Sequence, residues 1–238
     1  MNIALIGYGK MGKEIETIVR ERGHEVPLII DISNSHDLTQ ENLKNIDVAI
    51  EFTVPTTAYN NYIQCFKAQV PVVSGTTGWL NQYDEIINEC KVHSAGFFYA
   101  SNFSLGVNIF FELNKKLAKL MNSFPEYDVA MEEIHHTQKL DAPSGTAITL
   151  AQDIIQEVKR KKHWTLQEFS DESDFQIVAK RLGKVHGTHT ITYDSEVDSI
   201  EISHMAKSRK GFALGAVLAA EFMKDKKGIY SMKDLLGI

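Results

Sequence analysis

The stretch NIALIGYGKMGKEIETIVRERG, residues 2–23, contains the clearest indication of the fold. It begins with a short apolar run typical of a buried strand, continues through the glycine-spaced loop GYGKMG, and ends in a sequence with helical periodicity. In this order of strand, loop and helix, the pattern G-x-G-x-x-G is the fingerprint of a dinucleotide-binding turn. Gly7 permits the tight turn, Gly9 lets the backbone approach a pyrophosphate, and Gly12 allows the helix to pack closely on the strand. A tight turn with a helix cap would also explain the glycines, but the flanking strand and helix favour dinucleotide binding.

An acidic residue completes the fingerprint. Asp31 ends the second predicted strand, HEVPLIID, where it could accept hydrogen bonds from the ribose hydroxyls of an adenosine. Two further loops, SGTTGW and ASNFS, follow predicted strands, and ligands bind outside the carboxyl ends of parallel strands. The predicted cofactor-binding residues are Gly7, Tyr8, Gly9, Lys10, Met11, Gly12, Asp31, Gly75, Thr76, Thr77, Ala100, Ser101, Asn102 and Phe103.

Apolar strands alternate with helices over the first hundred residues. The pattern predicts strands at 2–7, 24–31, 47–53, 70–75 and 96–101, with helices at 11–23, 56–69 and 80–93. Such alternation is typical of βαβ units, and helices on both faces of a parallel sheet would explain why the strands lack polar alternation. This part of the chain therefore predicts a Rossmann-like cofactor domain.

The pattern changes after residue 103. It predicts helices at 106–124 and 144–162, a strand at 127–136, and two alternating strands at 187–193 and 198–204 that suit an antiparallel sheet with one covered face. The last segment, 211–238, reads as helical and should pack on the first domain. The predicted fold class is α/β, with a Rossmann-like parallel-sheet domain of residues 1–102 and 209–238 and a smaller α+β substrate and oligomerisation domain of residues 103–208.

The stretch EEIHHTQKLDAPSGTA, residues 132–147, concentrates polar chemistry at one place. His135 and His136 are adjacent on a strand end, so their side chains should point to opposite faces, which disfavours a shared metal ion. One histidine can act as a general acid near neutral pH while the other contacts a substrate. The helix beginning near Gly145 and Thr146 offers N–H groups to a carboxylate, and Lys139 adds a positive charge. A capped helix beside a solvated strand end would explain the helix start but not HHTQK.

Composition and charge exclude several classes of protein. The net charge is −6 with mixed signs, which predicts no nucleic-acid partner, and no apolar run is long enough to span a membrane. The basic run VKRKKHW, residues 158–164, is interpreted as a solvated helix end. Cys65 and Cys90 are predicted to be buried thiols, no metal ion is expected, and the N-terminal MNIALIG lacks the pattern of a signal peptide, so we expect a cytoplasmic protein.

The stretch 132–147 resembles the signature of the dihydrodipicolinate reductase family. The segments GYGKMG, AIEFTVP, SGTTGW, ASNFSLGVN and SRKGFALGAV also occur in the order found in that family, so the resemblance covers nearly the whole chain. It implies NADH- or NADPH-dependent reduction of a cyclic unsaturated dicarboxylate to tetrahydrodipicolinate, on the diaminopimelate route to lysine. It also implies a homotetramer assembled through the second domain.

The resemblance assigns roles to individual residues. His135 corresponds to the proton donor and acceptor of the family, and Lys139 to its catalytic lysine, also a proton donor and a substrate contact. His136 corresponds to a substrate contact, and Gly145 with Thr146 to the site that binds a substrate carboxylate.

The glycine loop is one residue shorter than in many family members, and the arginine that often follows the acid is missing. Asp31 is followed by Ile32, Ser33, Asn34 and Ser35, and no lysine or arginine occurs before Lys44. A 2′-phosphate would therefore face a carboxylate without a compensating cation. The sequence predicts NADH as the preferred cofactor, with NADPH as the alternative.

Two other functions compete with this interpretation. Another nicotinamide oxidoreductase, such as an amino-acid or sugar dehydrogenase, would share the two-domain plan but not the HHTQK and PSGT constellation. A non-enzymatic dinucleotide sensor would keep GYGKMG but would have no reason to keep His135 and Lys139 together.

Overall fold

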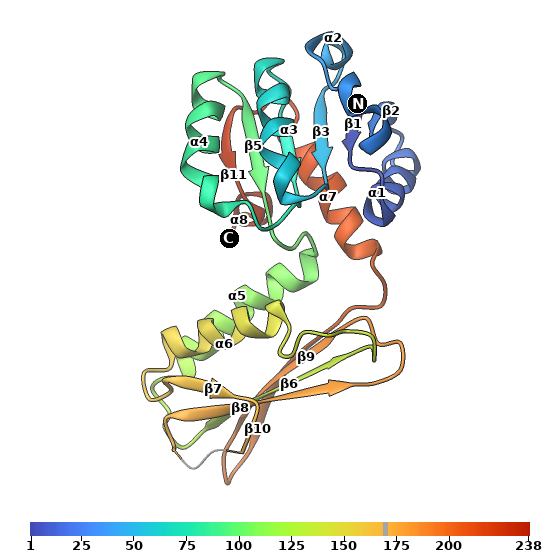
Figure 1. Ribbon diagram of the computed structural model, residues 1–238. Coiled ribbons are helices and arrows are strands. Elements are labelled where there is room, and N and C mark those ends of the chain that lie inside the picture. The colour runs from blue at the N-terminus through green and yellow to red at the C-terminus, as the bar shows by residue number, and fades with distance from the viewer. Residues whose placement is uncertain (169–170) are drawn as a thin grey trace. The chain divides into compact units, whose positions relative to one another are not determined.

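The computed structural model describes residues 1–168 and 171–238, which form two compact units (Figure 1). Met1–Leu105 and Lys210–Ile238 make up the first unit, and Gly106–Arg209 makes up the second. The predicted division, between residues 102 and 103 and between 208 and 209, lies close to these boundaries. Among the described residues, none of the helices combines the length and the apolar character needed to cross a membrane.

The first unit is built on a six-stranded sheet whose paired strands are all parallel, in the order β11-β5-β4-β3-β1-β2. Its strands are β1 (Asn2–Ile6), β2 (Glu25–Ile30), β3 (Val48–Glu51), β4 (Val72–Ser74), β5 (Gly96–Tyr99) and β11 (Gly228–Tyr230). Its helices are α1 (Lys10–Glu21), α2 (Gln40–Leu43), α3 (Pro55–Lys67), α4 (Tyr83–Val92), α7 (Lys210–Met223) and α8 (Met232–Leu236), with two 3₁₀ turns, η1 (Ile32–Asp37) and η2 (Leu80–Gln82). The predicted Rossmann-like architecture is confirmed.

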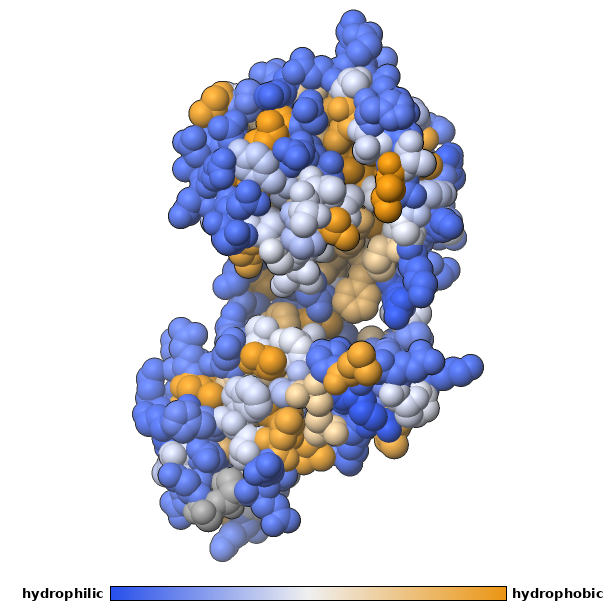
Figure 2. Space-filling model, viewed as in Figure 1, coloured by the Kyte–Doolittle hydropathy of each residue, from blue (hydrophilic) through white to orange (hydrophobic). Residues whose placement is uncertain are grey.

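Two hydrophobic clusters cover the two faces of this sheet, with α1 and α7 on one face and α3 and α4 on the other (Figure 1). Alternate residues of β1 point to different clusters, since Leu5 packs with Val19 and Val217 while Ile6 packs with Tyr62 and Phe66. Both faces of the strands are therefore buried, which explains their continuous apolar sequence. Hydrophilic residues cover most of the visible outer surface of the helices (Figure 2).

The C-terminal segment packs on the first unit, but the prediction that it is wholly helical is wrong. After α7, the chain forms β11, which extends the sheet by pairing in parallel with β5. Three residues are too few to show a strand periodicity, and the first of them, Gly228, has φ +103°, a backbone conformation that favours glycine. The edge strand therefore leaves almost no pattern in the sequence.

The second unit contains a five-stranded sheet in the order β10-β9-β6-β8-β7, crossed on one face by two helices (Figure 1). Its elements are α5 (Leu105–Met121), β6 (Asp128–His135), α6 (Gly145–Glu157), β7 (His163–Thr165), β8 (Asp174–Arg181), β9 (Thr188–Asp194) and β10 (Ser199–Met205). The pairs β6–β9 and β9–β10 are antiparallel, whereas β6–β8 and β7–β8 are parallel. The predicted antiparallel pairing of the strands at 187–193 and 198–204 is confirmed. The sheet as a whole is mixed, because it also contains β7 and β8, which were not predicted.

The helices α5 and α6 bury one face of this sheet. Val129 and Met131 of β6 and Ile191 and Tyr193 of β9 join Leu150 of α6 in one core cluster. The residues that alternate with them are largely polar and half-buried or exposed. One face of the sheet is thus packed by helices, and the other carries threonine, serine and acidic side chains.

The basic run that follows α6 is not a solvated helix end. The helix ends at Glu157, and Arg160 then donates to the carbonyl oxygens of Met121 and Tyr127 at 3.1 and 2.6 Å. Lys161 is 3% exposed and donates to the carbonyl oxygens of Glu172 and Asp174, at 2.8 Å each. The side chains of Arg160 and Lys161 therefore donate hydrogen bonds to backbone carbonyl oxygens just after the helix. The interpretation of this run as a solvated helix end is wrong. The prediction that Cys65 and Cys90 are buried thiols is confirmed.

Candidate active site

The glycine loop between β1 and α1 has the geometry that the fingerprint requires. Gly7 has φ +94°, and a Cβ atom there would lie 2.0 Å from the Phe52 carbonyl oxygen. A Cβ atom on Gly12 would lie 2.3 Å from the Gly7 carbonyl oxygen, whereas a Cβ atom on Gly9 would meet nothing within 4 Å. Close packing within the protein therefore explains why Gly7 and Gly12 lack a side chain. Gly9, in contrast, faces open space at the N-terminus of α1.

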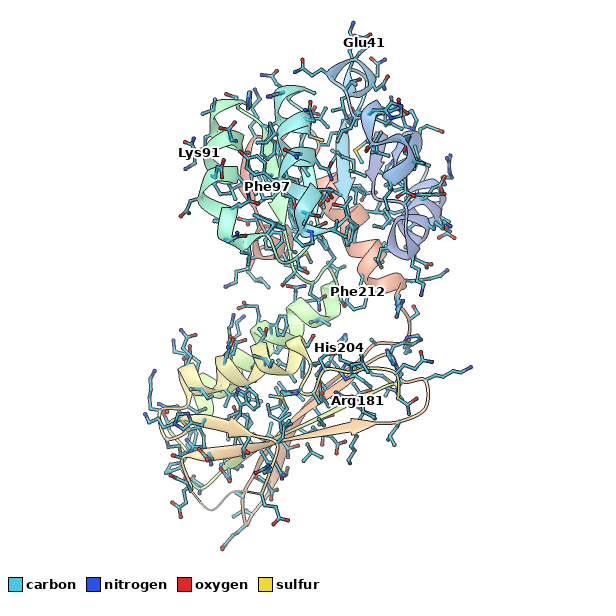
Figure 3. All side chains as sticks on the ribbon, in the orientation of Figure 1. Glu41, Lys91, Phe97, Arg181, His204 and Phe212 are labelled. Carbon is cyan, nitrogen blue, oxygen red and sulfur yellow. The ribbon has the colours of Figure 1, made fainter. Side chains whose placement is uncertain are left out.

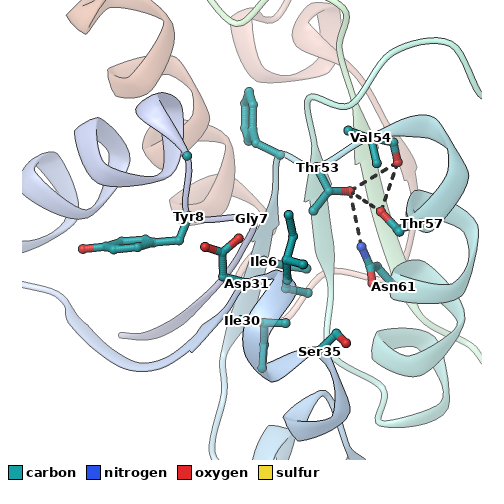
Figure 4. A pocket seen from close by; sticks show the side chains of 13 residues that line it. Ile6, Gly7, Tyr8, Ile30, Asp31, Ser35, Thr53, Val54, Thr57 and Asn61 are labelled. Carbon is teal, nitrogen blue, oxygen red and sulfur yellow. Dashed lines mark hydrogen bonds between the residues drawn. The ribbon is translucent and has the colours of Figure 1, made fainter.

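A cavity of about 270 Å³ opens beside this loop (Figure 4). The cavity is lined by the predicted residues Gly7, Tyr8, Gly9 and Asp31, together with side chains that the sequence analysis did not select. These additional residues are Ile6, Ile30, Ile32, Ser35, Phe52, Thr53, Val54, Thr57 and Asn61. Apolar walls, hydroxyl groups, one carboxylate and a helix N-terminus suit a nucleoside joined to phosphates. The site therefore fits a dinucleotide cofactor.

Lys10, Met11 and Gly12 lie in the first turn of α1, and the other predicted cofactor residues lie at the ends of the neighbouring strands β4 and β5. A Cβ atom on Gly75 would lie 2.2 Å from the Phe52 ring. Phe103 packs against Phe52 and Phe98, with ring centroids 5.6 and 5.9 Å apart. The Asn102 side chain accepts a hydrogen bond from the Ser104 backbone N–H at 2.9 Å. Ala100 and Phe103 are buried, so they contribute shape and backbone rather than exposed polar groups.

A buried carboxylate connects the loops after β3 and β4. Glu51 is fully buried and accepts hydrogen bonds from Ser74 at 2.9 Å, from Thr76 at 3.0 Å and from Thr53. Burial raises the pKa of Glu51, and these hydrogen bonds oppose that rise. The Thr76 hydroxyl also accepts from the Thr53 backbone N–H at 2.7 Å. The Thr76 side chain therefore organises the loops, and a direct cofactor contact would fall to its backbone.

In the second unit, the end of β6 carries the residues of the predicted reaction site. His135 is 7% exposed, and His136 is half-buried, which fits side chains on opposite faces of the strand. The Nδ1 atom of His135 lies 3.5 Å from Oε2 of Glu133. His189 of β9 lies opposite Glu133 in the strand register, and its ring meets that of His135 at 5.1 Å between centroids. The strand thus presents a buried cluster on one face and His136 on the other.

The loop between β6 and α6 carries Lys139. Its Nζ atom lies 2.9 and 2.8 Å from the two carboxylate oxygens of Asp141. Arg181, at the end of β8 (Figure 3), donates to the carbonyl oxygens of Lys139 and Asp141 at 3.4 and 2.5 Å. The same guanidinium donates to Glu133 at 3.0 Å. Arg181 therefore joins the lysine-bearing loop to the buried cluster.

The start of α6 completes the site. Ser144 is the N-cap, and its Oγ accepts a hydrogen bond from the Ala147 backbone N–H at 3.2 Å. Gly145 and Thr146 occupy the first turn, where the helix itself offers their N–H groups no acceptor. Such groups, with the positive end of the helix dipole, favour an anion. The geometry of the helix start therefore suits the predicted carboxylate-binding role of both residues.

The cluster holds one ionised and one neutral group at neutral pH. Burial raises the pKa of Glu133, but interactions with His189, Ser144 and Arg181 outweigh burial and hold that pKa at about 2. Burial lowers the pKa of His135 to about 4, against the opposing effect of the Glu133 charge. His135 is therefore neutral at pH 7 before a ligand binds. To donate a proton as an imidazolium, it must first take one up when an anionic substrate arrives.

Ligand atoms of Glu133, His135 and His189 lie within 4.8 Å of one another, close enough to share a metal ion. The Glu133 carboxylate, however, already accepts hydrogen bonds from Arg181 and from the Ser144 backbone N–H. The neighbouring guanidinium would repel a cation. The donor set therefore fits a hydrogen-bonding cluster better than a metal centre.

Glu133, Arg181 and His189 were not among the residues predicted from the sequence. His189 occupies a core-facing position in the alternating strand THTITYD, and a polar residue on a buried face is a signal that could have been used. Arg181 pairs in register with His135, but β8 was not predicted, so their proximity could not be inferred.

Comparisons with protein families match the two halves of the chain separately. The family described as "Dihydrodipicolinate reductase, N-terminus" matches residues 1–103, and "Dihydrodipicolinate reductase, C-terminus" matches residues 106–236.

Two relatives are similar to the chain over almost its whole length. The 4-hydroxy-tetrahydrodipicolinate reductase of Christiangramia forsetii is 56% identical over 237 residues, covering 99% of this chain and 98% of that protein. The reductase of the same name from Thermosipho africanus is 34% identical over 238 residues, covering 99% and 98%.

Solved structures show the same similarity. A dipicolinate-bound dihydrodipicolinate reductase from Paenisporosarcina sp. TG-14 has a TM-score of 0.77 and 25% identity, with 97% of each chain covered. An amine dehydrogenase from Mycobacterium smegmatis, with a TM-score of 0.60 and 11% identity, covers 98% of this chain and 95% of its own and shares the fold alone.

Proposed function

The chain belongs to the dihydrodipicolinate reductase family, and from this premise we propose that it reduces 4-hydroxy-tetrahydrodipicolinate to tetrahydrodipicolinate with NAD(P)H, on the diaminopimelate route to lysine. The observation that carries the proposal is the site at the end of β6. There, a buried histidine, a lysine and a helix N-terminus occur together in a chain that is 56% identical to a reductase of this name. These groups suit a substrate that carries two carboxylates and needs one proton.

A nicotinamide dinucleotide bound in the first unit supplies a hydride. The substrate gains that hydride and one proton and loses water, so the protein must deliver a proton and hold two carboxylates. His135 delivers the proton from its imidazole after the anionic substrate has raised its pKa. Lys139 exchanges Asp141 for a substrate carboxylate and is a second proton donor, while the N–H groups of Gly145 and Thr146 bind a carboxylate. His136 contacts the substrate from the other side of the strand.

The test is an assay of NADH absorbance with the freshly made product of dihydrodipicolinate synthase. NADH should be oxidised only when both the protein and this substrate are present. Binding of NADH without oxidation would favour a dinucleotide sensor. Oxidation with amino-acid or sugar substrates instead would favour another dehydrogenase.

NADH is the preferred cofactor in this proposal. Asn34, which could have donated to a 2′-phosphate, instead accepts from the Asp31 backbone N–H at 2.7 Å and donates to the Ile29 carbonyl oxygen at 3.0 Å. Ile32 is 94% exposed beside Asp31, where an NADPH-binding protein would place a cation. We expect NADH to exceed NADPH in kcat/KM by roughly tenfold, the effect of about 1.4 kcal/mol.

The variant Ile32→Arg should narrow or reverse that ratio. Val197→Arg is the matched control, since Val197 is 90% exposed and lies in the second unit. A preference of the wild-type protein for NADPH would refute the role of Asp31. An unchanged ratio in Ile32→Arg would show that the missing cation is not the cause.

A homotetramer built through the sheet of the second unit is also proposed. The helices α5 and α6 cover one face of that sheet, and β10 forms its edge with seven residues. An edge strand and an uncovered polar face are surfaces on which copies of a chain can pair. Thr190 and Ser203, hydrogen-bonded to each other at 2.9 Å, lie on the uncovered face.

A further inference from the structure

We propose that Glu133 is the positioning residue of the reaction site. One buried carboxylate orients the proton-donating histidine and, at the same time, fixes the two elements that bind substrate carboxylates. This inference rests on the proposed function, because it assigns His135, Lys139 and the start of α6 to catalysis and substrate binding.

Glu133 is fully buried and meets groups from four parts of the second unit. Its Oε2 lies 3.5 Å from His135 Nδ1 on the same strand and 3.6 Å from His189 Nε2 on β9. Its two oxygens accept from the Ser144 backbone N–H at 3.2 and 3.1 Å, and its Oε1 accepts from Arg181 at 3.0 Å. A buried carboxylate is costly without such partners, so its position is set by all of them together.

The first group that Glu133 positions is the imidazole of His135. Nδ1 of this imidazole is buried and makes no hydrogen bond within the described residues, and the carboxylate oxygen of Glu133 is the charged atom it faces. A carboxylate there favours the tautomer that carries its proton on Nδ1, which leaves Nε2 to exchange a proton with a ligand. On the Nε2 side, a Cβ atom on Gly187 would lie 3.0 Å away, and Gly187 has φ +151°. The ring is therefore held between a carboxylate and a glycine, and a longer Nδ1 contact can shorten once substrate is bound.

Glu133 also positions the carboxylate-binding elements. The hydrogen bond from the Ser144 backbone N–H to Glu133 anchors the N-cap residue of α6, which directly precedes Gly145 and Thr146. The ion pair with Arg181 neutralises a guanidinium whose other donors hold the carbonyl oxygens of Lys139 and Asp141. Loss of the Glu133 charge would leave a half-buried cation unpaired and would loosen the loop that carries the lysine.

His189 supports the same arrangement from β9. Its Nε2 lies 3.1 Å from Ser144 Oγ as well as 3.6 Å from Glu133 Oε2. The ring thus touches both the N-cap and the carboxylate that anchors it. We assign His189 a positioning role within the network, through Ser144 and Glu133, with no contact to the reacting atoms.

The experiment compares Glu133→Gln with Glu132→Gln in the full-length protein. Glu132 is the neighbouring residue on the same strand, half-buried, and pairs with Lys180 on the opposite face, so it controls for loss of an acid on β6. For Glu133→Gln we expect kcat to fall by about ten- to a hundredfold, part of the roughly 10²–10⁴-fold that a positioned acid contributes. The KM for the dicarboxylate should rise by about tenfold, as for one lost charged contact. The KM for NADH should stay within about twofold, because the cofactor loop belongs to the first unit.

A spectroscopic readout separates positioning from general loss of structure. In the wild-type protein, ¹⁵N chemical shifts should show His135 mainly protonated on Nδ1 and titrating well below the usual range. In Glu133→Gln, the Nε2-protonated tautomer should gain population. Glu133→Asp keeps the charge and should recover part of kcat, which a purely steric role would not predict.

The outcomes separate the inference from the proposed function. If the wild-type protein reduces the substrate but Glu133→Gln matches Glu132→Gln in kcat, KM and histidine tautomer, Glu133 is not the positioning residue. If the wild-type protein does not oxidise NADH with this substrate, the proposed function itself fails. Should Glu133→Gln not fold, the wild-type tautomer and the Glu133→Asp kinetics decide. A stoichiometric metal ion in the purified protein, with activity lost on chelation, would overturn the inference in favour of a metal centre.

Discussion

His135 lies where protonation is opposed by burial and by its neighbours. Burial lowers its pKa to about 4, and His189, Lys139 and Arg181 act in the same direction, while the Glu133 charge opposes them. A dicarboxylate bound nearby adds negative charge and must raise the pKa again. In the proposed mechanism, His135 therefore acquires its proton when the substrate binds.

The first prediction at this scale is proton uptake on ligand binding. Below pH 4, His135 is already protonated, and above its ligand-bound pKa it remains neutral, so uptake should occur between these limits, for example at pH 6. Calorimetric titration with dipicolinate in buffers of different ionisation enthalpy measures the uptake directly. His135→Ala should abolish it. Equal uptake in the variant and the wild type would show that another group takes the proton.

The second prediction concerns turnover. His135→Ala and Lys139→Ala should each lower kcat by about 10²–10⁴-fold, because each removes a proton donor from a positioned site. Lys139→Ala should also raise the KM for the dicarboxylate, because the ammonium binds a carboxylate. His163→Ala, on the short strand β7, is the control. Turnover near the wild-type value in either site variant would remove that residue from the mechanism.

The residues proposed to contact ligands could be selected from the sequence, whereas the residues that position them could not. His135, Lys139, Gly145 and Thr146 stand in one continuous stretch, so their proximity follows from chain connectivity. Arg181 comes from elsewhere in the chain and meets the stretch only through sheet pairing. From the sequence, the Asn34 side chain could have contacted a 2′-phosphate. In the fold, it instead forms hydrogen bonds with the backbone of Asp31 and Ile29.

Among the elements, the strand–loop–helix unit at the N-terminus contains glycines with two different roles: one allows close packing, and the other leaves space for a ligand. A methyl group on Gly12 would meet the Gly7 carbonyl oxygen at 2.3 Å, whereas one on Gly9 would enter open space. Gly12→Ala should therefore lower the thermal midpoint, since overpacking costs about 1–3 kcal/mol. Gly9→Ala should leave the midpoint unchanged but weaken NADH binding by about tenfold or more, because the methyl group occupies the approach to the pyrophosphate. Thermal unfolding and NADH fluorescence titration distinguish the two effects, and tight NADH binding by Gly9→Ala would place the pyrophosphate elsewhere.

The elements that could be predicted were those with a clear period. The βαβ alternation of the first hundred residues and the helices α5 and α6 were predicted correctly in type. Strand β8 was missed although Phe175 and Ile177 are buried, because the following Val178 and Ala179 break the alternation. Strand β11 was missed because three residues at a sheet edge carry no period. The parallel pairs that make the second sheet mixed all involve β8. Because β8 was not predicted, the mixed pairing could not be predicted either.

At the scale of the whole molecule, the uncovered sheet face predicts assembly. Light scattering at micromolar concentration should give a homotetramer. Ser203→Arg, on the uncovered face of the edge strand β10, should weaken it, because a charge desolvated at an interface is costly. Val92→Arg, at a 66% exposed position of α4, should leave the assembly unchanged. A wild-type monomer would refute the assembly. A tetramer that is unaffected by Ser203→Arg would show that the interface lies on another surface.

In the proposed reaction, hydride transfer from NADH is joined to protonation of a cyclic dicarboxylate. The most direct measurement uses NADH deuterated at the transferred position, the fresh product of dihydrodipicolinate synthase, and mass analysis of the product. We expect one deuterium in tetrahydrodipicolinate for each NADH oxidised by the wild-type protein, and almost no product with His135→Ala. Oxidation of NADH without label in the product, or no oxidation at all, would contradict the proposed reaction.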